Sequence, residues 1–213
     1  MLLLGQLRAP LEQPSVALER AFATPLGSVA CDAEGVRALG LERTPEELAH
    51  RGALVLERQC LFLRLLFPRL AIVPVLAAEL DPRTRGRETA VERAVEGLAR
   101  VLALPGRTLV LCASDLHERT GPPPGPEAAR ALREEDRECI ERAAAADAEG
   151  LLARAGRRRE GAGGLFALWL LARLASGRRS LDPDRGPLEG SVLGYQQMQG
   201  PGTFASAASV LFH

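Results

Sequence analysis

The order of apolar and polar positions predicts strands that alternate with helices along the chain. Short continuous apolar runs at 2–4, 70–76 and 108–114 are typical of strands buried on both faces of a parallel sheet. Turn residues at 24–27 precede a fourth short strand, expected at 28–31. Two closing strands, 190–199 and 203–211, are separated by Gly200-Pro201-Gly202, which predicts a hairpin.

Between these strands, apolar residues recur at the spacing of helices. Asp32 is expected to cap a helix, Thr44-Pro45 to start another, and Pro68 to end a third. The helices are expected at 33–39, 56–67, 87–104, 127–142, 145–154 and 165–174.

Alternation of this kind, without a repeat or a long linker, predicts one α/β domain over residues 1–213. Its expected architecture has three layers, α/β/α, around a mixed and largely parallel central sheet. The strand 108–114 is expected in the middle of that sheet because its apolar run is continuous. Pro74 predicts an edge position or a bulge for the strand 70–76.

The composition matches an ordinary globular domain, with 46% apolar and 25% charged residues. The 27 basic and 27 acidic residues balance, so no global field favours nucleic acid or an anionic membrane as a partner. No apolar run reaches the roughly 18 residues of a membrane span, and the first residues do not form a signal peptide. We therefore expect a cytoplasmic protein.

The four cysteines, Cys31, Cys60, Cys112 and Cys139, are widely spaced and form no C-x-x-C pair. Most of them lie in apolar stretches. Buried free thiols are therefore expected rather than disulfides or a zinc site.

One dense polar group stands where the strand 108–114 ends. Ser114, Asp115 and His117 place a hydroxyl, a carboxylate and an imidazole at a strand terminus, the usual location of sites in α/β sheets. The alternative is structural, since Ser114 or Asp115 is also suited to capping the next segment.

With these segments in order, the chain resembles the Memo family, the protein B of the AmmeMemoRadiSam system, which is related in fold to the class III extradiol dioxygenases. The best preserved piece is Thr24-Pro25-Leu26-Gly27 followed by Asp32. The strand 2–4 followed by Gly5, and the closing segments around Tyr195 and Ser206, are similar as well.

Several positions depart from the family's motifs. Arg8 stands at or next to the family histidine that follows the strand matched by residues 2–4. Arg58 stands in place of the histidine after Glu57, and Ala162 stands in place of a cysteine. Asp115 and His117 resemble the family's Ser-Ser-Asp-Phe-x-His with one residue missing between them. The family's first strand and its His-Ala-Gly-Tyr motif have no counterpart.

The resemblance implies that most of the family's metal donors are replaced. The favoured interpretation is a degenerate, non-catalytic member that binds an unknown protein or small molecule through Arg8, Glu57, Arg58 and Ser114, with no metal and no cofactor. At least one of the two arginines is expected within contact reach of Asp115, Glu57 or His117, most simply as an ion pair.

Two alternatives stay open. The first is a metal-dependent redox or dioxygenase-like enzyme using copper, iron or zinc, with Asp115 and His117 as catalytic residues and Cys112 as a further donor. The second is that the true gene start lies upstream, so that a longer product carries the first histidine motif.

Overall fold

The computed structural model describes residues 1–6, 15–17, 19–41, 54–77, 87–105, 108–114, 116–155, 165–181 and 190–212. The expected helix start at Thr44 lies outside these ranges. The chain divides into two compact units, Met1–Ala113 and Ser114–His213, and each is described by itself.

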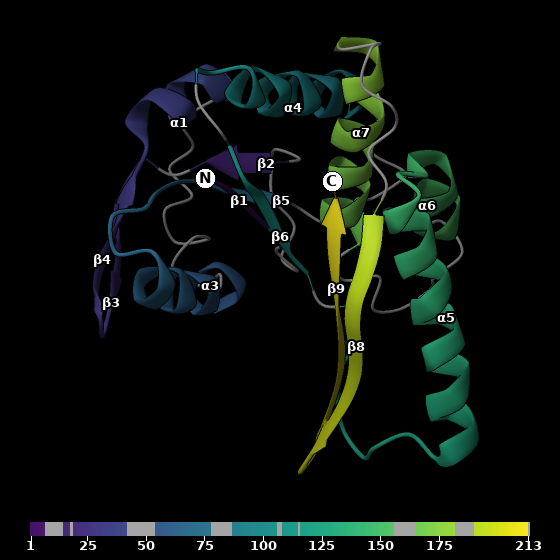
Figure 1. Ribbon diagram of the computed structural model, residues 1–213. Coiled ribbons are helices and arrows are strands. Elements are labelled where there is room, and N and C mark those ends of the chain that lie inside the picture. Colours follow the sequence, from purple (N-terminus) through teal and green to yellow (C-terminus); the bar gives the residue numbers. More distant parts are fainter. Residues whose placement is uncertain are drawn as a thin grey trace. The chain divides into compact units, whose positions relative to one another are not determined.

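A mixed, largely parallel sheet forms the centre of the first unit, as the sequence predicts (Figure 1). Its strands are β1 (Leu2–Gln6), β2 (Ser15–Ala17), β3 (Phe22–Thr24), β4 (Gly27–Cys31), β5 (Ala71–Ala77) and β6 (Val110–Ala113). The strand order is β3-β4-β5-β1-β6, and β2 pairs with β5. The pairs β1–β5, β1–β6 and β4–β5 are parallel, whereas β2 and β3 run antiparallel to their neighbours.

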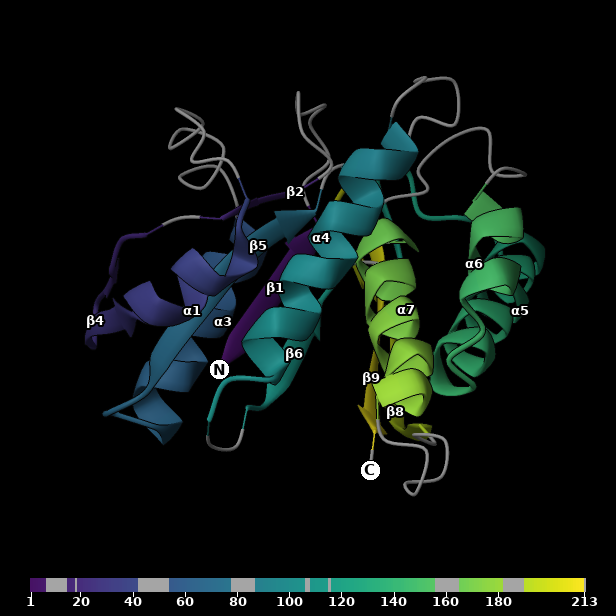
Figure 2. The same ribbon diagram turned by 90° about the horizontal axis from the view of Figure 1, so that it is seen from above.

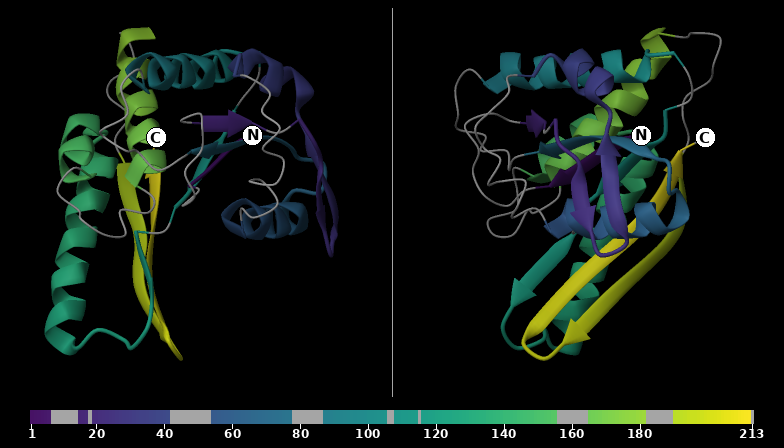
Figure 3. Two further views of the ribbon diagram at one scale, coloured as in Figure 1. Left: turned by 180° about the vertical axis from the view of Figure 1, so that it is seen from behind. Right: turned by 90° about the vertical axis from the view of Figure 1, so that its left-hand side faces the viewer.

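Helices cover both faces of this sheet, which confirms the three-layer α/β/α arrangement (Figures 1 and 3). Helices α1 (Ala33–Leu39) and α4 (Arg87–Leu102) lie on one face, and α3 (Leu54–Leu66) lies on the other. The α3 side holds a core cluster of Leu3, Phe22, Val29, Leu56, Cys60, Leu63, Ile72 and Leu76.

Two expectations about the sheet are wrong. The strand at 108–114 becomes β6, which stands at one end of the strand order of the described residues and not in the middle. Its first three residues are only half-buried. A continuous apolar run shows that a strand contacts the core, but it does not tell how many neighbouring strands it has.

Pro74 lies in an interior strand, because β5 has partners along both edges and no bulge in its pairing with β1. Val73 N donates to Met1 O on the β1 side, and Ile72 O accepts from Asp32 N on the opposite side. Successive residues of a strand direct their N–H groups to alternate edges. The backbone nitrogen of Pro74, which carries no hydrogen, therefore faces the same edge as Ile72 and not β1. There β4 pairs only up to Ile72 and β2 only from Val75, so Pro74 occupies the gap between them.

Helix α1 is fixed by its cap and by α4. The Asp32 carboxylate accepts a hydrogen bond from Gly35 N at 3.0 Å, as expected for an N-cap. At the other end of α1, Arg100 donates to Ala38 O at 2.9 Å and to Leu39 O at 2.8 Å. A Cβ atom at Gly97 would lie 2.2 Å from Leu39 O, so α1 and α4 cross there at a distance that only glycine permits.

The second unit combines three helices with an antiparallel sheet. Its elements are β7 (His117–Thr120), α5 (Pro126–Ala144), α6 (Ala148–Ala155), α7 (Leu165–Leu181), β8 (Gly190–Gly200) and β9 (Thr203–Phe212). The strand order is β7-β9-β8, and β8 and β9 form the expected hairpin, seen as the long yellow ribbon in Figure 3. Helix α5 packs on β8 and β9 and also contacts α6 and α7, which lie beside each other (Figure 2).

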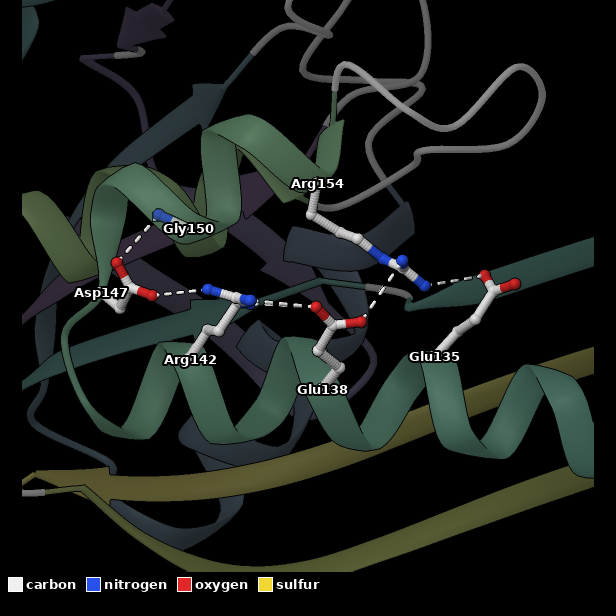
Figure 4. A network of polar contacts seen from close by, with 6 residues as sticks. All are labelled: Glu135, Glu138, Arg142, Asp147, Gly150 and Arg154. Carbon is white, nitrogen blue, oxygen red and sulfur yellow. Dashed lines mark hydrogen bonds and ion pairs between the residues drawn. The ribbon is translucent and has the colours of Figure 1, made fainter.

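A network of ion pairs joins α5 to α6 (Figure 4). Arg142 contacts Glu138 at 3.1 Å and Asp147 at 2.7 Å, while Arg154 of α6 reaches back to Glu138 at 3.3 Å. Asp147 also accepts a hydrogen bond from Gly150 N at 2.8 Å and so caps the start of α6. The same carboxylate therefore fixes the end of one helix and the beginning of the next.

We predict that Gly97→Ala destabilises the first unit by about 1–3 kcal/mol, because the added methyl group meets a backbone carbonyl that cannot move without separating α1 from α4. Urea denaturation followed by circular dichroism measures this. Glu96→Ala, at an exposed position on the same helix, is the control and should change stability by less than about 0.5 kcal/mol. Equal stability of the two variants would contradict the close crossing.

Candidate functional site

The carboxyl ends of the parallel strands β1, β5 and β6 meet at one edge of the first unit's sheet. These strands end at Gln6, Ala77 and Ala113. The first turn of α3 borders this edge, since a Cβ atom at Gly5 would lie 2.7 Å from the Leu56 side chain. Ligands of α/β sheets bind at the carboxyl ends of strands, so this carboxyl edge is the candidate site.

A row of residues crosses the sheet at this edge. Gln6 is in register with Ala77, and Ala77 is in register with Ser15 of β2. Side chains in register lie on the same face of a sheet, so Gln6 and Ser15 flank the small Ala77 side chain. Both polar residues are buried. The Ser15 hydroxyl has no hydrogen-bond partner among the described residues. It can therefore still donate or accept a hydrogen bond, although it is buried.

The structure describes the predicted site residues only in part. Arg8 and Asp115 lie outside the described residues, and of His117 only the backbone is described, at the position on β7 opposite Ser206. Ser114 directly follows β6 and is half-buried, and its hydroxyl has no hydrogen-bond partner among the described residues. The proposed contact between an arginine and Asp115 or His117 therefore stays a prediction.

Glu57 and Arg58 lie on α3, and both side chains are exposed. Neither forms an ion pair with another residue of the described part of the chain. Their role in ligand binding also stays a prediction.

The second unit holds a polar cluster that the sequence analysis did not find. Asp136 of α5 is fully buried, and its carboxylate accepts a hydrogen bond from the Tyr195 hydroxyl of β8 at 2.7 Å. Gln197 of β8 donates to Ala129 O at 3.1 Å and accepts from Arg133 at 3.1 Å. The signal was present, because Asp136 occupies the same helical stripe as the buried residues Cys139, Ile140 and Ala143.

The environment of Tyr195 keeps its phenol protonated. Burial raises the pKa of Tyr195 well above its ordinary value, and the hydrogen bond to the Asp136 carboxylate and the negative charge of that group raise it further. A hydroxyl held in this state donates a hydrogen bond over the whole physiological pH range. The pair thus fastens the buried face of α5 to β8.

The four cysteines are free, as expected, although only Cys60 and Cys139 are fully buried and Cys31 and Cys112 are half-buried. Burial raises the pKa of Cys31 to about 11 and the pKa values of Cys60 and Cys112 to about 12. Negative charges add to the increase for Cys31, from Glu19 and Asp32, and for Cys60, from Glu57. These three thiols are therefore protonated at neutral pH, and a protonated thiol is a poor nucleophile.

A site for copper, iron or zinc needs about three or four donors. Among the residues that the structure describes, no three His, Cys, Asp or Glu side chains come together. The described side chains alone therefore do not assemble the donors of a transition-metal centre.

A separate cavity of about 330 Å³ opens at the opposite edge of the same sheet. It is lined by residues that include Met1, Asp32, Glu34, Val101 and Thr108. Met1 and Thr108 precede β1 and β6, so this cavity lies at the amino ends of the strands. It is distinct from the row of Gln6 and Ser15.

The first unit is a three-layer α/β/α fold with the candidate site at the carboxyl edge of its sheet. Comparison with known proteins gives the family: a sequence model of the Memo-like proteins matches residues 1–182, and the chain belongs to that family. A MEMO1 family protein from Archaeoglobus fulgidus is 37% identical over 95 residues, which are 44% of this chain and 34% of that protein. The matched part therefore spans about a third of the length of that relative.

None of the helices that the structure describes is both long and apolar enough to cross a membrane.

We predict that Tyr195 resists ionisation in the folded protein. It is the only tyrosine, so absorbance at 295 nm reports it alone. Folding raises the pKa of Tyr195, so the protonated phenol contributes fully to the free energy of unfolding below the unfolded pKa of about 10. That contribution is lost as the pH rises through the pKa of the folded protein. In urea the phenol should titrate near pH 10, and in the folded protein only above it. Asp136→Asn should lower the folded pKa, whereas Glu135→Gln, a partly exposed neighbour, should not.

We predict that alkylation of the described thiols at pH 8 is slow. A rise in pKa from 9 to about 11 reduces the thiolate fraction of Cys31 by about 100-fold, and the reduction is larger for Cys60 and Cys112. Iodoacetamide labelling followed by peptide mass spectrometry measures each site separately, with the urea-unfolded chain as the control. A thiol that reacts at the unfolded rate would show that its burial is not maintained in solution.

Proposed function

We propose that this chain is a non-catalytic member of the Memo-like family that works by binding a small polar ligand or a partner at the carboxyl edge of its first unit. The observation that carries the proposal is the row at that edge, where the Ser15 hydroxyl is buried without a hydrogen-bond partner in the described chain, in register with Ala77 and Gln6. An unpaired buried hydroxyl costs about 1–3 kcal/mol, and a bound polar group would offset that cost.

The residues that the family resemblance places near this edge support binding over metal catalysis. Arg8 stands two residues beyond Gln6, and in this proposal its guanidinium replaces a histidine. A guanidinium does not ligate a cation, but it presents a rigid fork of donors suited to carboxylate or phosphate. The raised pKa values of Cys60 and Cys112 support a non-catalytic role, because a protonated thiol is a poor nucleophile.

The test begins with the chain purified without an affinity tag. Elemental analysis should find copper, iron and zinc each far below one atom per chain. Inorganic phosphate then serves as the anion probe in a thermal melt, and saturation should raise Tm by a few degrees. Arg8→Ala should abolish the rise. Arg137→Ala is the control, because Arg137 lies exposed in a surface pair with Glu141, and it should keep the rise.

Two results would contradict the proposal. Stoichiometric metal that disappears in His117→Ala would establish the alternative, a metal-dependent redox or dioxygenase-like enzyme with a site around Asp115 and His117. A phosphate effect that is the same in Arg8→Ala and Arg137→Ala would remove Arg8 from the site.

A further inference from the structure

A run of prolines joins β7 to α5, and it is the teal loop at the lower end of α5 in Figure 1. Residues 122–126 read Pro-Pro-Pro-Gly-Pro, and the last of them, Pro126, is the first residue of α5. A proline ring fixes φ at about −65°, and a residue before a proline favours extended backbone. Gly125 has a φ of −61° and a ψ of 166°, close to the polyproline II conformation. We call residues 122–126 the proline segment, and these observations indicate a short polyproline II helix.

The exposure of the proline segment follows the three-residue period of this helix type. Pro124 is half-buried, as is Gly121 three residues before it. The other residues of the segment are exposed: Pro122, Pro123, Gly125 and Pro126. Every third residue of a polyproline II helix lies on the same edge. One edge of the segment therefore faces the second unit, and the other two edges face solvent.

Both ends of the proline segment are fixed by the fold. Gly121 has a φ of 125°, and its N–H donates to Gly202 O of the hairpin turn at 2.9 Å. This positive φ favours glycine, which turns the chain out of β7 and into the segment. At the other end, Gly125 O accepts a hydrogen bond from Ala129 N at 2.9 Å in the first turn of α5. The segment is therefore pre-organised, and binding to it costs little conformational entropy.

The order of residues in the proline segment has the pattern Pro-x-x-Pro, formed by Pro123 and Pro126. Segments with this pattern bind in grooves lined by aromatic side chains, as in SH3 domains. Each of the two prolines and the residue before it form one dipeptide, and Pro124 separates the two dipeptides. Since Pro124 is the residue that faces the second unit, both dipeptides are accessible from the same side.

A positive charge stands next to the second dipeptide. Arg130 lies four residues after Pro126, so the two residues share one face of α5. Its side chain is exposed and forms no ion pair with another described residue. Glu127 is exposed as well, but it lies about 100° around the helix from Pro126. A groove with an acidic residue beside its second pocket therefore complements this surface.

We propose that the proline segment is a docking site for a partner domain with an aromatic-lined groove for polyproline II helices. The dipeptides that end in Pro123 and Pro126 fill two neighbouring pockets of the groove. An acidic residue of the partner, beside the second pocket, pairs with Arg130. The docking site lies in the second unit and does not depend on the ligand proposed for the carboxyl edge of the first unit.

A second copy of this chain fits the proline segment less well. The only tryptophan, Trp169, is buried, and the hydroxyl of the only tyrosine, Tyr195, is bonded to Asp136. Neither ring is therefore available to line a groove for another chain. The occupant that fits is a separate domain.

Titration of isotope-labelled groove domains with the full chain tests the proposal by nuclear magnetic resonance. The probes are an SH3 domain with an acidic groove flank, a WW domain and an EVH1 domain. The chain should shift the signals of groove residues of the SH3 domain, with a Kd of roughly 1 mM or tighter. Pro123→Ala should weaken this binding at least about 10-fold. Pro68→Ala is the matched control, because Pro68 is an exposed proline of the first unit, and it should leave the Kd unchanged.

Further variants test the orientation of the proline segment. Pro124→Ala changes the edge that faces the second unit, so it should weaken binding by less than about 3-fold. Arg130→Glu should weaken it by about 3- to 10-fold. Arg137→Glu, at an exposed position farther along α5, should leave it unchanged. All variants should keep the circular dichroism of the wild type. A loss in Pro124→Ala as large as that in Pro123→Ala would overturn the orientation, and an unchanged Kd in Arg130→Glu would overturn the acidic flank.

Other results would overturn the docking site itself. Absence of binding by all three domains at about 1 mM chain would do so, as would binding that Pro123→Ala leaves unchanged. Self-association of the wild type that is lost in Pro123→Ala would assign the proline segment to a second copy of the chain instead.

Discussion

The first unit depends on the burial of β1 on both faces of its sheet. Leu2, Leu3 and Leu4 are completely buried, and the strand is paired with β5 along one edge and with β6 along the other. A strand in this position requires apolar partners above and below, which α3 on one side and α1 with α4 on the other supply. Because β1 runs parallel to both neighbours, their carboxyl ends meet at one edge, and the polar row lies at that edge.

The two units differ in whether a buried polar side chain has a hydrogen-bond partner. In the second unit, the buried Asp136 carboxylate has a partner in Tyr195, so its burial is compensated and the pair fastens α5 to β8. In the first unit, the Ser15 hydroxyl is buried at the carboxyl edge and has no partner in the described chain. The first arrangement is what a stable interior requires. The second leaves a hydrogen-bonding group available, and the proposed function assigns it to a ligand.

The row of Gln6 and Ser15 lies on the α1 side of the sheet. Gln6 has the same parity along β1 as Leu2 and Leu4, whereas Leu3 and Gly5 point toward α3. Along β5, Ala77 has the parity of Val73, which contacts Gly35 of α1. The polar row and the core cluster under α3 therefore occupy opposite faces of the same sheet.

The sequence by itself determined most of the elements and the family, but it did not predict the short strands β2, β3 and β7. Local chemistry is sufficient for the predicted elements: Asp32 caps α1, Pro68 follows the end of α3, and Gly202 with a φ of 71° permits the hairpin between β8 and β9. That Arg8 and Arg58 stand where the family has histidines is what the resemblance implies, and it stays a prediction.

Only the tertiary structure decided how the elements are arranged. The end position of β6, the gap that accommodates Pro74 and the pairing of Asp136 with Tyr195 each depend on residues far apart in the chain. The exposed leucines and phenylalanine of α3 are the clearest case. Leu54, Phe62 and Leu65 are as apolar as the buried Leu56 and Leu63, and only the position of the sheet decides which of them the first unit buries.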